Sequence, residues 1–297
     1  MGEYSSSWIL LLFFFWSMIS PALFVLLGNG DGTFGEPIIF SLEYFGLLIY
    51  MIVADFNQDQ LFDIALADGY AASVTILLGN GDGSFIEGTK FFPEGCKYPS
   101  QIATADFDND SYLDIVIACD GASNSSVYFG NADGLFLERI ILHTERSTSA
   151  YSVAVTDFNG DNYTDIIIVG EKFRTVSVFL GYGNGSFDKE QDIVLSYVYG
   201  SAIYMSPVVS DFNRDGYLDI ATVTMSSYAV DIFFGDGNGN FETCRIFSTE
   251  FYGGFTSIVT GDFNADGYPD IITTYEDPGG IHILLNRGQY NFFRINT

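Results

Sequence analysis

The chain has 297 residues, of which 48% are hydrophobic and 17% aromatic, so it carries ample apolar area for a packed core, which excludes a disordered acidic tail. Asp and Glu number 38 against 11 Lys and Arg, and the net charge of -27 would repel a phosphate backbone. A nucleic-acid partner is therefore not expected, and the excess of carboxylates favours cations.

The first element is an apolar segment, residues 1–21. Its run WILLLFFFWSMI at positions 8–19 has the length of a signal-peptide core, and Ser20, Pro21 and Ala22 follow it. No Lys or Arg precedes the run, and cleavage after Ala22 would fall directly before the repeated part of the chain. Three alternatives stay open: a cleaved secretion signal, a membrane anchor, or a degenerate strand region of the domain that follows.

Residues 22–297 form the second predicted domain, which is built from two motifs that recur in phase. A nine-residue loop rich in Asp, called the Asp loop below, begins at Asp55, Asp106, Asp157, Asp211 and Asp262. A turn rich in Gly, called the glycine turn, ends in Phe34, Phe85, Phe136, Phe187, Phe241 and Phe292. The Asp loops are 51, 51, 54 and 51 residues apart, and each such period holds four short β-rich runs. Four strands in a period near 50 residues predict a propeller blade.

The third complete unit shows the expected strands: YSVAVTD enters the loop at Asp157, DIIIVG leaves it, and TVSVFLG and SFDKEQDIVL follow. The strand after each Asp loop is almost entirely apolar, which predicts burial on both faces. We predict that the Phe of each glycine turn packs between blades. The first glycine turn lies between expected strands near residues 22–27 and 37–42 and has no Asp loop before it. The predicted fold is thus an all-β propeller of four-stranded blades, with five complete blades and an N-terminal half or degenerate blade.

Each Asp loop has Asp at positions 1, 5 and 9 and Asn or Asp at position 3, and a backbone carbonyl at position 7 would complete a ligand shell. Hard oxygen ligands at alternate residues favour calcium over zinc or copper. Glycine at position 6, as in Gly216 and Gly267, suits a left-handed backbone; Asn162 tolerates that conformation, and Ser111 and Gln60 less readily. The alternative is that Asp and Asn only cap turns. We predict up to five Ca²⁺ sites, with no other cofactor. The predicted ligands are Asp55, Asn57, Asp59, Leu61, Asp63, Asp106, Asp108, Asp110, Tyr112, Asp114, Asp157, Asn159, Asp161, Tyr163, Asp165, Asp211, Asn213, Asp215, Tyr217, Asp219, Asp262, Asn264, Asp266, Tyr268 and Asp270.

These motifs, above all DFNRDGYLDI and LLGNGDGTF, resemble the FG-GAP/VCBS repeats of integrin α-subunit N-terminal β-propellers over residues 22–297. The resemblance implies that the 1-to-2 loops bind calcium on one face of the ring, and that the 2-to-3 and 4-to-1 loops on the opposite face meet a ligand. In this chain the second set includes residues 67–73, 88–100, 118–126, 142–150, 169–175, 223–229, 248–255 and 275–280. The chain is short and the ring is incomplete, so integrin function itself is not carried over.

We expect a calcium-binding adhesion module, secreted or at the cell surface, that binds a protein or glycan ligand. Membrane contact is expected only through an N-terminal anchor. One alternative is a calcium-dependent hydrolase or lyase acting on polysaccharide or lipid; another is a non-binding structural fragment of a larger adhesion protein. No catalytic residue is predicted, because only His143 and His282 are present, each on an expected strand, and no nucleophile motif occurs. Cys96, Cys119 and Cys244 allow at most one intrachain disulfide.

Overall fold

A computed structural model shows how the repeats fold. It describes residues 11–14, 22–41, 48–121, 124–144, 150–170, 175–194, 207–223, 229–242, 245–248, 255–275, 279–288 and 292–295. Within these ranges the secondary structure consists of β-strands without a helix, as the sequence predicts. The strands form one three-stranded sheet and five four-stranded sheets in the described part of the chain.

Each sheet is made of strands that are consecutive in sequence and antiparallel. The three-stranded sheet holds β1 (Leu11–Phe14), β2 (Ala22–Leu26) and β3 (Ile38–Ser41). The next two sheets hold β4 (Leu48–Ala54), β5 (Asp63–Asp68), β6 (Ser73–Gly79) and β7 (Phe85–Phe91), then β8 (Tyr98–Ala105), β9 (Asp114–Asp120), β10 (Asn124–Phe129) and β11 (Glu138–His143). The last three hold β12 (Ala150–Thr156), β13 (Asp165–Gly170), β14 (Thr175–Gly181) and β15 (Phe187–Val194), then β16 (Val208–Ser210), β17 (Asp219–Val223), β18 (Ala229–Phe233) and β19 (Arg245–Ser248), then β20 (Phe255–Gly261), β21 (Asp270–Tyr275), β22 (Gly280–Asn286) and β23 (Phe292–Ile295).

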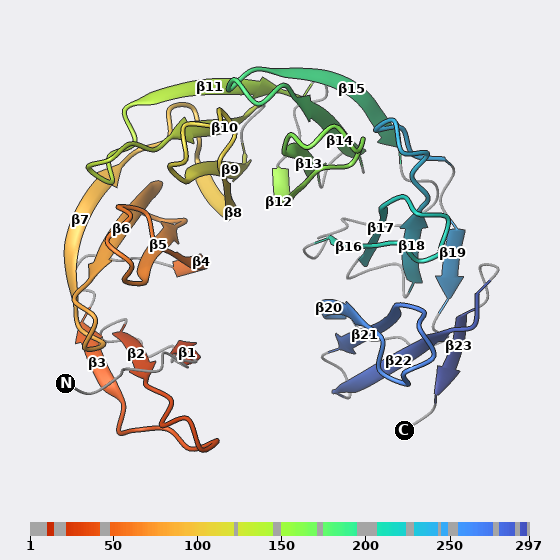
Figure 1. Cartoon of the computed structure of the whole chain (residues 1–297), viewed down its shortest axis with the longest axis horizontal. Coiled ribbons are helices and arrows are strands. Elements are labelled where there is room, and N and C mark those ends of the chain that lie inside the picture. Colours follow the sequence, from red (N-terminus) through yellow and green to blue (C-terminus); the bar gives the residue numbers. More distant parts are fainter. Residues whose placement is uncertain are drawn as a thin grey trace.

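The sheets stand around a common axis, which confirms the predicted β-propeller (Figure 1). The first strand of each four-stranded sheet, such as β4 or β12, lies nearest the axis, and the fourth, such as β7 or β15, lies on the rim. The arc is open between the β1–β3 sheet and the β20–β23 sheet. The three-stranded sheet is the place where the sequence predicts a half or degenerate blade, and in the described residues it has neither the strand nor the Asp loop that open the other sheets.

The strand that follows each Asp loop forms the centre of its sheet. Every residue of β5, β13 and β17 is buried, as the unbroken apolar runs predict. Apolar side chains of consecutive sheets meet in continuous clusters: Phe56 and Ile76 of one sheet pack with Ile117 and Phe136 of the next. Burial between sheets therefore holds the arc together, at about 25 cal/mol for each Å² of apolar surface removed from water.

An aromatic pair recurs at the junctions between sheets. The Phe at position 2 of an Asp loop meets the Phe of the next sheet's glycine turn edge to face, at centroid distances of 5.5–6.2 Å, in the pairs Phe56–Phe136, Phe107–Phe187, Phe158–Phe241 and Phe212–Phe292. This confirms that the glycine-turn Phe side chains pack between blades. At the first junction Phe85 meets Phe40 instead, at 6.5 Å, because the three-stranded sheet has no Asp loop. Phe34 is the exception: it is 41% exposed, and among the described residues no sheet packs against it from the preceding side.

Two further features are the pairing of the first strand and a disulfide bond. Strand β1, from the apolar N-terminal segment, pairs with β2 through the register Leu11↔Leu26 to Phe14↔Leu23. Cys96, before β8, forms a disulfide with Cys119 of β9, whereas Cys244 lies outside the described residues. In the described part of the chain no helix is long and apolar enough to cross a membrane.

Candidate metal sites

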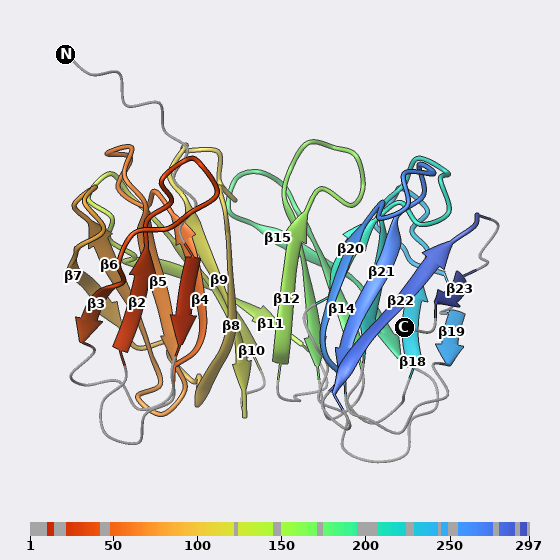
Figure 2. The ribbon, with the colours of Figure 1, turned by 90° about the horizontal axis from the view of Figure 1, so that it is seen from below.

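The five Asp loops occupy equivalent places in the fold, each joining the first and second strands of a four-stranded sheet. In the side view they lie along the same edge of the sheets as the glycine turns, as the loop between β12 and β13 shows (Figure 2). The repeat thus places its carboxylates on one face of the propeller.

The carboxylate at position 1 organises the backbone of each loop. In the first loop, Asp55 Oδ1 accepts the N–H of Asp59 at 3.1 Å, and Oδ2 accepts the N–H of Gln60 at 2.8 Å. Both hydrogen bonds recur in the other four loops. The carboxylate at position 5 in turn accepts the N–H of position 7, as Asp59 does from Leu61 at 2.8 Å. These bonds curl the loop backbone around the carboxylates at positions 1 and 5.

The curl requires a left-handed backbone at two positions. Position 6 has positive φ in every loop, as predicted, including Gln60 at 68° and Ser111 at 75°. Position 4 also has positive φ in every loop, which the sequence did not reveal, because the residues there share no side-chain chemistry: they are Gln58, Asn109, Gly160, Arg214 and Ala265. A non-glycine residue in this conformation costs about 1–2 kcal/mol, so the hydrogen bonds of positions 1 and 5 offset a repeated strain.

The carboxylate at position 9 is different, because it is fully buried in all five loops. Asp114 Oδ2 accepts the N–H of Phe107 at 2.8 Å, and its Oδ1 accepts the N–H of Gly130 at 2.9 Å. The equivalent pair of bonds joins position 2 and the first residue of the glycine turn in every sheet. Position 9 therefore ties the Asp loop to the glycine turn of the same sheet, a role that the sequence pattern did not identify.

Burial perturbs these carboxyl groups. It raises the pKa of Asp114 to about 7, of Asp165 to about 6 and of Asp219 to about 7, despite the two backbone N–H groups that each carboxylate accepts. The pKa of Asp63 is also raised, by burial first and by the nearby Asp59 and Asp55 charges after it. Burial thus shifts these groups toward the neutral form relative to an exposed Asp, and a neighbouring cation would oppose that shift.

The second loop brings three acidic side chains closest together. One carboxylate oxygen from each of Asp106, Asp108 and Asp114 lies within 4.8 Å of the others, and among the described residues this is the one such group. Two oxygens bound to one Ca²⁺ at about 2.4 Å can lie up to roughly 4.8 Å apart, so the donor set fits a calcium ion in both spacing and chemistry. Burial, with repulsion from Asp110 and Asp106, raises the pKa of Asp108, which a bound cation would offset.

The other four loops carry Asn at position 3. In the first of them Asn57 Oδ1 accepts the N–H of Asp59, while Asn57 Nδ2 donates to Asp59 Oδ2 at 3.0 Å. The same amide-to-carboxylate bond recurs at positions 3 and 5 of the third, fourth and fifth loops. Asp108 lacks an amide that could make this bond, which is why the second loop differs. The assignment of the 25 ligand positions stays a prediction.

Adjacent loops also touch. Gln58 Nε2 donates to the carbonyl oxygen of Ser111 in the next Asp loop, and Arg214 lies 4.6 Å from the ring centroid of Tyr268 in the loop after its own. Asn109 Nδ2 donates to the carbonyl of Gly183 in the next glycine turn at 2.8 Å. Position 4 of the first, second and fourth loops therefore reaches the neighbouring sheet.

The first glycine of a glycine turn lies close to a backbone carbonyl of the Asp loop in the same sheet, which leaves no room for a side chain. A Cβ on Gly181 would lie 2.2 Å from the carbonyl oxygen of Thr164, at position 8 of its Asp loop. Gly79 and Gly235 meet the equivalent oxygen at the same distance. A side chain at this point would separate the turn from the carboxylate at position 9.

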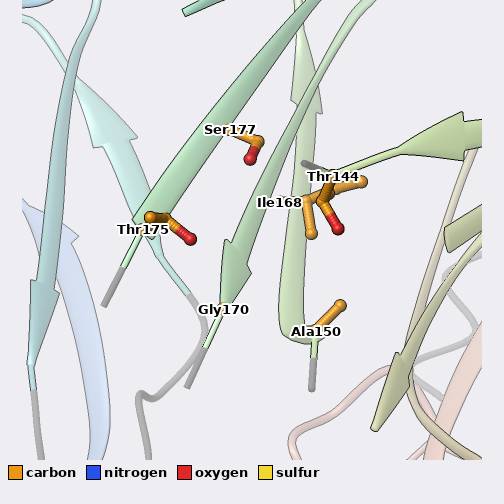
Figure 3. A pocket seen from close by; sticks show the side chains of 6 residues that line it. All are labelled: Thr144, Ala150, Ile168, Gly170, Thr175 and Ser177. Atoms are coloured by element: carbon orange, nitrogen blue, oxygen red, sulfur yellow. The ribbon is translucent and has the colours of Figure 1, made fainter. Parts of the chain in front are cut away.

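A recess lies at the opposite end of the sheets, where β11 ends and β12 begins (Figure 3). It is lined by Thr144, Ala150, Ile168, Gly170, Thr175 and Ser177. These six side chains include no acid, base or thiol, so the recess offers no acid–base pair for catalysis.

The loops expected to face a ligand are described only in part. Residues 122–123, 145–149, 171–174, 224–228, 249–254 and 276–278 of those loops lie outside the described residues. Of the residues described, Tyr70 between β5 and β6 is 71% exposed and Phe92 between β7 and β8 is 65% exposed. The two histidines lie on strands, as the sequence predicts. The Nδ1 atom of His143 lies 3.0 Å from Asn124 Oδ1, and His282 is buried between Phe255 and Tyr275.

The fold and the repeated loop define a repeat β-propeller, a class of protein that serves in general as a binding module. The model of the FG-GAP-like repeat matches residues 55–117, 106–168, 157–222 and 211–273, which together cover more than half of the chain. The chain therefore belongs to the FG-GAP-like repeat family, as the sequence motifs predict.

Two relatives agree with this assignment, and a solved structure shows a similar fold. The chain is 30% identical over 99 residues to integrin alpha-PS5 of Drosophila melanogaster, covering 30% of this chain and 10% of that protein. It is 27% identical over 201 residues to integrin alpha-V of Gallus gallus, covering 58% of this chain and 19% of that protein. The alignments thus span about a tenth and about a fifth of these relatives. The periplasmic gluconolactonase PpgL of Pseudomonas aeruginosa has a similar fold, with a TM-score of 0.70 at 13% identity over 93% of this chain and 77% of that one.

Proposed function

We propose that the chain is a calcium-stabilised propeller, secreted or exposed at the cell surface, that binds a protein or glycan ligand. The observation that carries the proposal is the group formed by Asp106, Asp108 and Asp114, whose oxygens lie within 4.8 Å of one another in a loop whose plan recurs five times. Up to five Ca²⁺ ions would bind, through the residues at positions 1, 3, 5, 7 and 9 of the Asp loops. The net charge of -27 supports cation binding, because each divalent ion would remove part of the repulsion between carboxylates.

An extracellular location is supported by two observations. The integrin relatives are similar over the repeat region, and the Cys96–Cys119 disulfide is of a kind that persists in oxidising compartments. A signal or anchor role for residues 1–21 would require β1 to leave its pairing with β2, so the proposal does not depend on such a role.

A binding role is favoured over catalysis. His143 and His282 are engaged in side-chain contacts on strands, and the recess of Figure 3 lacks ionisable groups. The similarity to PpgL is one of fold alone. We therefore propose that the chain is not an enzyme.

The ligand would meet the face opposite the Asp loops. Tyr70 and Phe92 support this, since large exposed aromatic side chains on loops are typical anchors of recognition surfaces. The integrin relatives favour a protein ligand, and a glycan is the alternative outcome. A glycan array and a panel of extracellular matrix proteins, probed with the wild-type chain and with Tyr70→Ser and Phe92→Ser variants, distinguish the two.

The test of metal binding is thermal unfolding in EGTA and in 10 mM CaCl₂. With Kd values of about 0.1–1 mM, typical of extracellular modules, each filled site adds about 1.4–2.7 kcal/mol of stability. Asp110→Asn should remove one site from the stoichiometry measured by calorimetry. Asp133→Asn, which removes the same charge from an exposed glycine turn, is the matched control and should leave the stoichiometry unchanged. Identical unfolding with calcium and with chelator would contradict the proposal.

A further inference from the structure

The two ends of the arc carry separate halves of the junction that recurs between the sheets. Phe56, Phe107, Phe158 and Phe212, at position 2 of the first four Asp loops, are at most 3% exposed, and each meets the turn Phe of the next sheet. Phe263 occupies the same position in the fifth loop and is 50% exposed. No sheet follows β20–β23 in the described structure, so this side chain lacks the ring that covers its equivalents.

Two further apolar residues of the last sheet are exposed in the same way. Val259 and Ile281 stand at the repeat positions of Ile52 and Val74, which pack against the following sheet. Val259 is 48% exposed and Ile281 is 50% exposed. We call the surface formed by Val259, Phe263 and Ile281 the tail face. Monomeric proteins rarely leave such contiguous apolar surface open to water.

The first sheet presents the complementary half. Its glycine turn is built like the others: Gly28 and Phe34 form the same bridge as Gly235 and Phe241, and Asn29 N–H donates to the carbonyl of Thr33 at 2.9 Å. Phe34 is nevertheless 41% exposed, whereas Phe241 is 5% exposed. This turn therefore has the same structure as the others, but among the described residues no Phe from position 2 of an Asp loop covers Phe34.

Two more residues extend this surface. Ile39 is 60% exposed, and because its neighbour Ile38 packs against the β4–β7 sheet, Ile39 points to the opposite side of the strand. A Cβ on Gly32, the third glycine of the turn, would have no atom within 4 Å, whereas a Cβ on the equivalent Gly185 would lie 2.9 Å from Phe129 of the preceding sheet. We call the surface formed by Gly32, Phe34 and Ile39 the head face.

The two faces cannot meet within one chain in this conformation. Figure 1 shows the sheets that carry them, β1–β3 and β20–β23, on opposite sides of the opening in the arc. Closing that opening would require the intervening junctions to tighten, yet these are already filled by buried side chains such as Phe107 and Phe187. Close-packed interfaces resist such deformation.

We propose that the head face of one copy docks on the tail face of a second copy, with Phe34 meeting Phe263 as Phe136 meets Phe56. The contact continues an interface that the molecule already uses between its own sheets. It joins two different surfaces, so each copy retains one free face after pairing, and association proceeds beyond the dimer unless the copies close into a ring. The inference does not depend on the ligand or on calcium binding.

The experiment measures mass by light scattering after size-exclusion chromatography, over a range of protein concentrations at 0.15 M salt, where the Debye length is about 8 Å and repulsion between copies is screened. The wild-type chain should reach at least twice the monomer mass as concentration rises. Phe34→Ser and Phe263→Ser should each be monomeric, with unchanged circular dichroism because both side chains are exposed. Phe92→Ser, which removes a 65% exposed Phe from another surface, should associate like the wild type.

Mixing supplies the decisive outcome. Phe34→Ser retains a tail face and Phe263→Ser retains a head face, so an equimolar mixture should form a dimer and nothing larger. Association of either variant alone, or a mixture that stays monomeric, would overturn the proposal. The proposal would also be overturned if the wild-type chain stayed monomeric and the double variant, Phe34→Cys with Phe263→Cys, formed an intrachain disulfide between these two positions. That result would mean that the ring closes on itself.

Discussion

The repeat offers an internal comparison of one residue in two environments, Phe56 and Phe263. Both occupy position 2 of an Asp loop, but Phe56 is fully buried against Phe136 with ring centroids 5.9 Å apart, and Phe263 is 50% exposed. Replacing a buried Phe by Ala typically costs about 3–5 kcal/mol, because transfer energy is lost and a cavity remains. We expect about 4 kcal/mol for Phe56→Ala.

For Phe263→Ala the same reasoning gives about 1 kcal/mol, since only half of the side chain is buried and the vacated space opens to solvent. The difference of about 3 kcal/mol is more than a hundredfold in the unfolding equilibrium constant. Urea unfolding followed by circular dichroism, at a protein concentration where the chain is monomeric and with calcium held constant, measures both values. Hydrogen exchange should locate the effect of Phe56→Ala in the β4–β7 and β8–β11 sheets. Equal losses for the two variants would refute the view that the Phe pairs hold consecutive sheets together.

Two further predictions concern pH and the disulfide. Because burial raises the folded-state pKa of Asp114 and Asp219 to about 7 and of Asp165 to about 6, above the usual 3.8, their contribution to stability is complete below about pH 4 and is lost as pH rises through 6–7. Thermal unfolding of the metal-free protein should show this decline, and it should be shallower for Asp114→Asn; a rise in stability over the same range would contradict the assignment. Replacing Cys96 and Cys119 by Ser should lower stability by about 3 kcal/mol, because the bond closes a loop with a sequence separation of 23, and unchanged urea unfolding would show that the loop is ordered without it.

The fold was accessible from the sequence because its signals are local and repeated. The apolar runs after each Asp loop predicted strands buried on both faces, and the structure confirms this for β5, β13 and β17. The turn Phe side chains were correctly placed between sheets, except for Phe34, whose exposure depends on what precedes its sheet. The exposure of a turn Phe therefore depends on the adjacent sheet and cannot be predicted from the sequence of one repeat.

The candidate site was predictable in outline only. Alternating oxygen ligands identified the loops, but the same pattern gave no sign that Asp114 is a buried hydrogen-bond acceptor for Phe107 and Gly130. Its partner in the glycine turn is 16 residues away, so the bond follows from strand pairing and not from the motif. The left-handed backbone at Arg214 and Ala265 was equally invisible, because these residue types carry no preference for it.

The aspartate at position 9 has a consequence for how such a chain can change its length. Its two hydrogen bonds close within one sheet, so the bonds that shape each unit do not depend on which unit comes next. The Phe pair, the apolar clusters between consecutive sheets and a few loop contacts cross the boundary, and every complete unit presents the same Phe on each side. Excision of residues 106–156 would leave Phe56 facing Phe187, a pairing of the same kind as the one it has now. Recombination between repeats can therefore add or remove whole units without inventing a new contact.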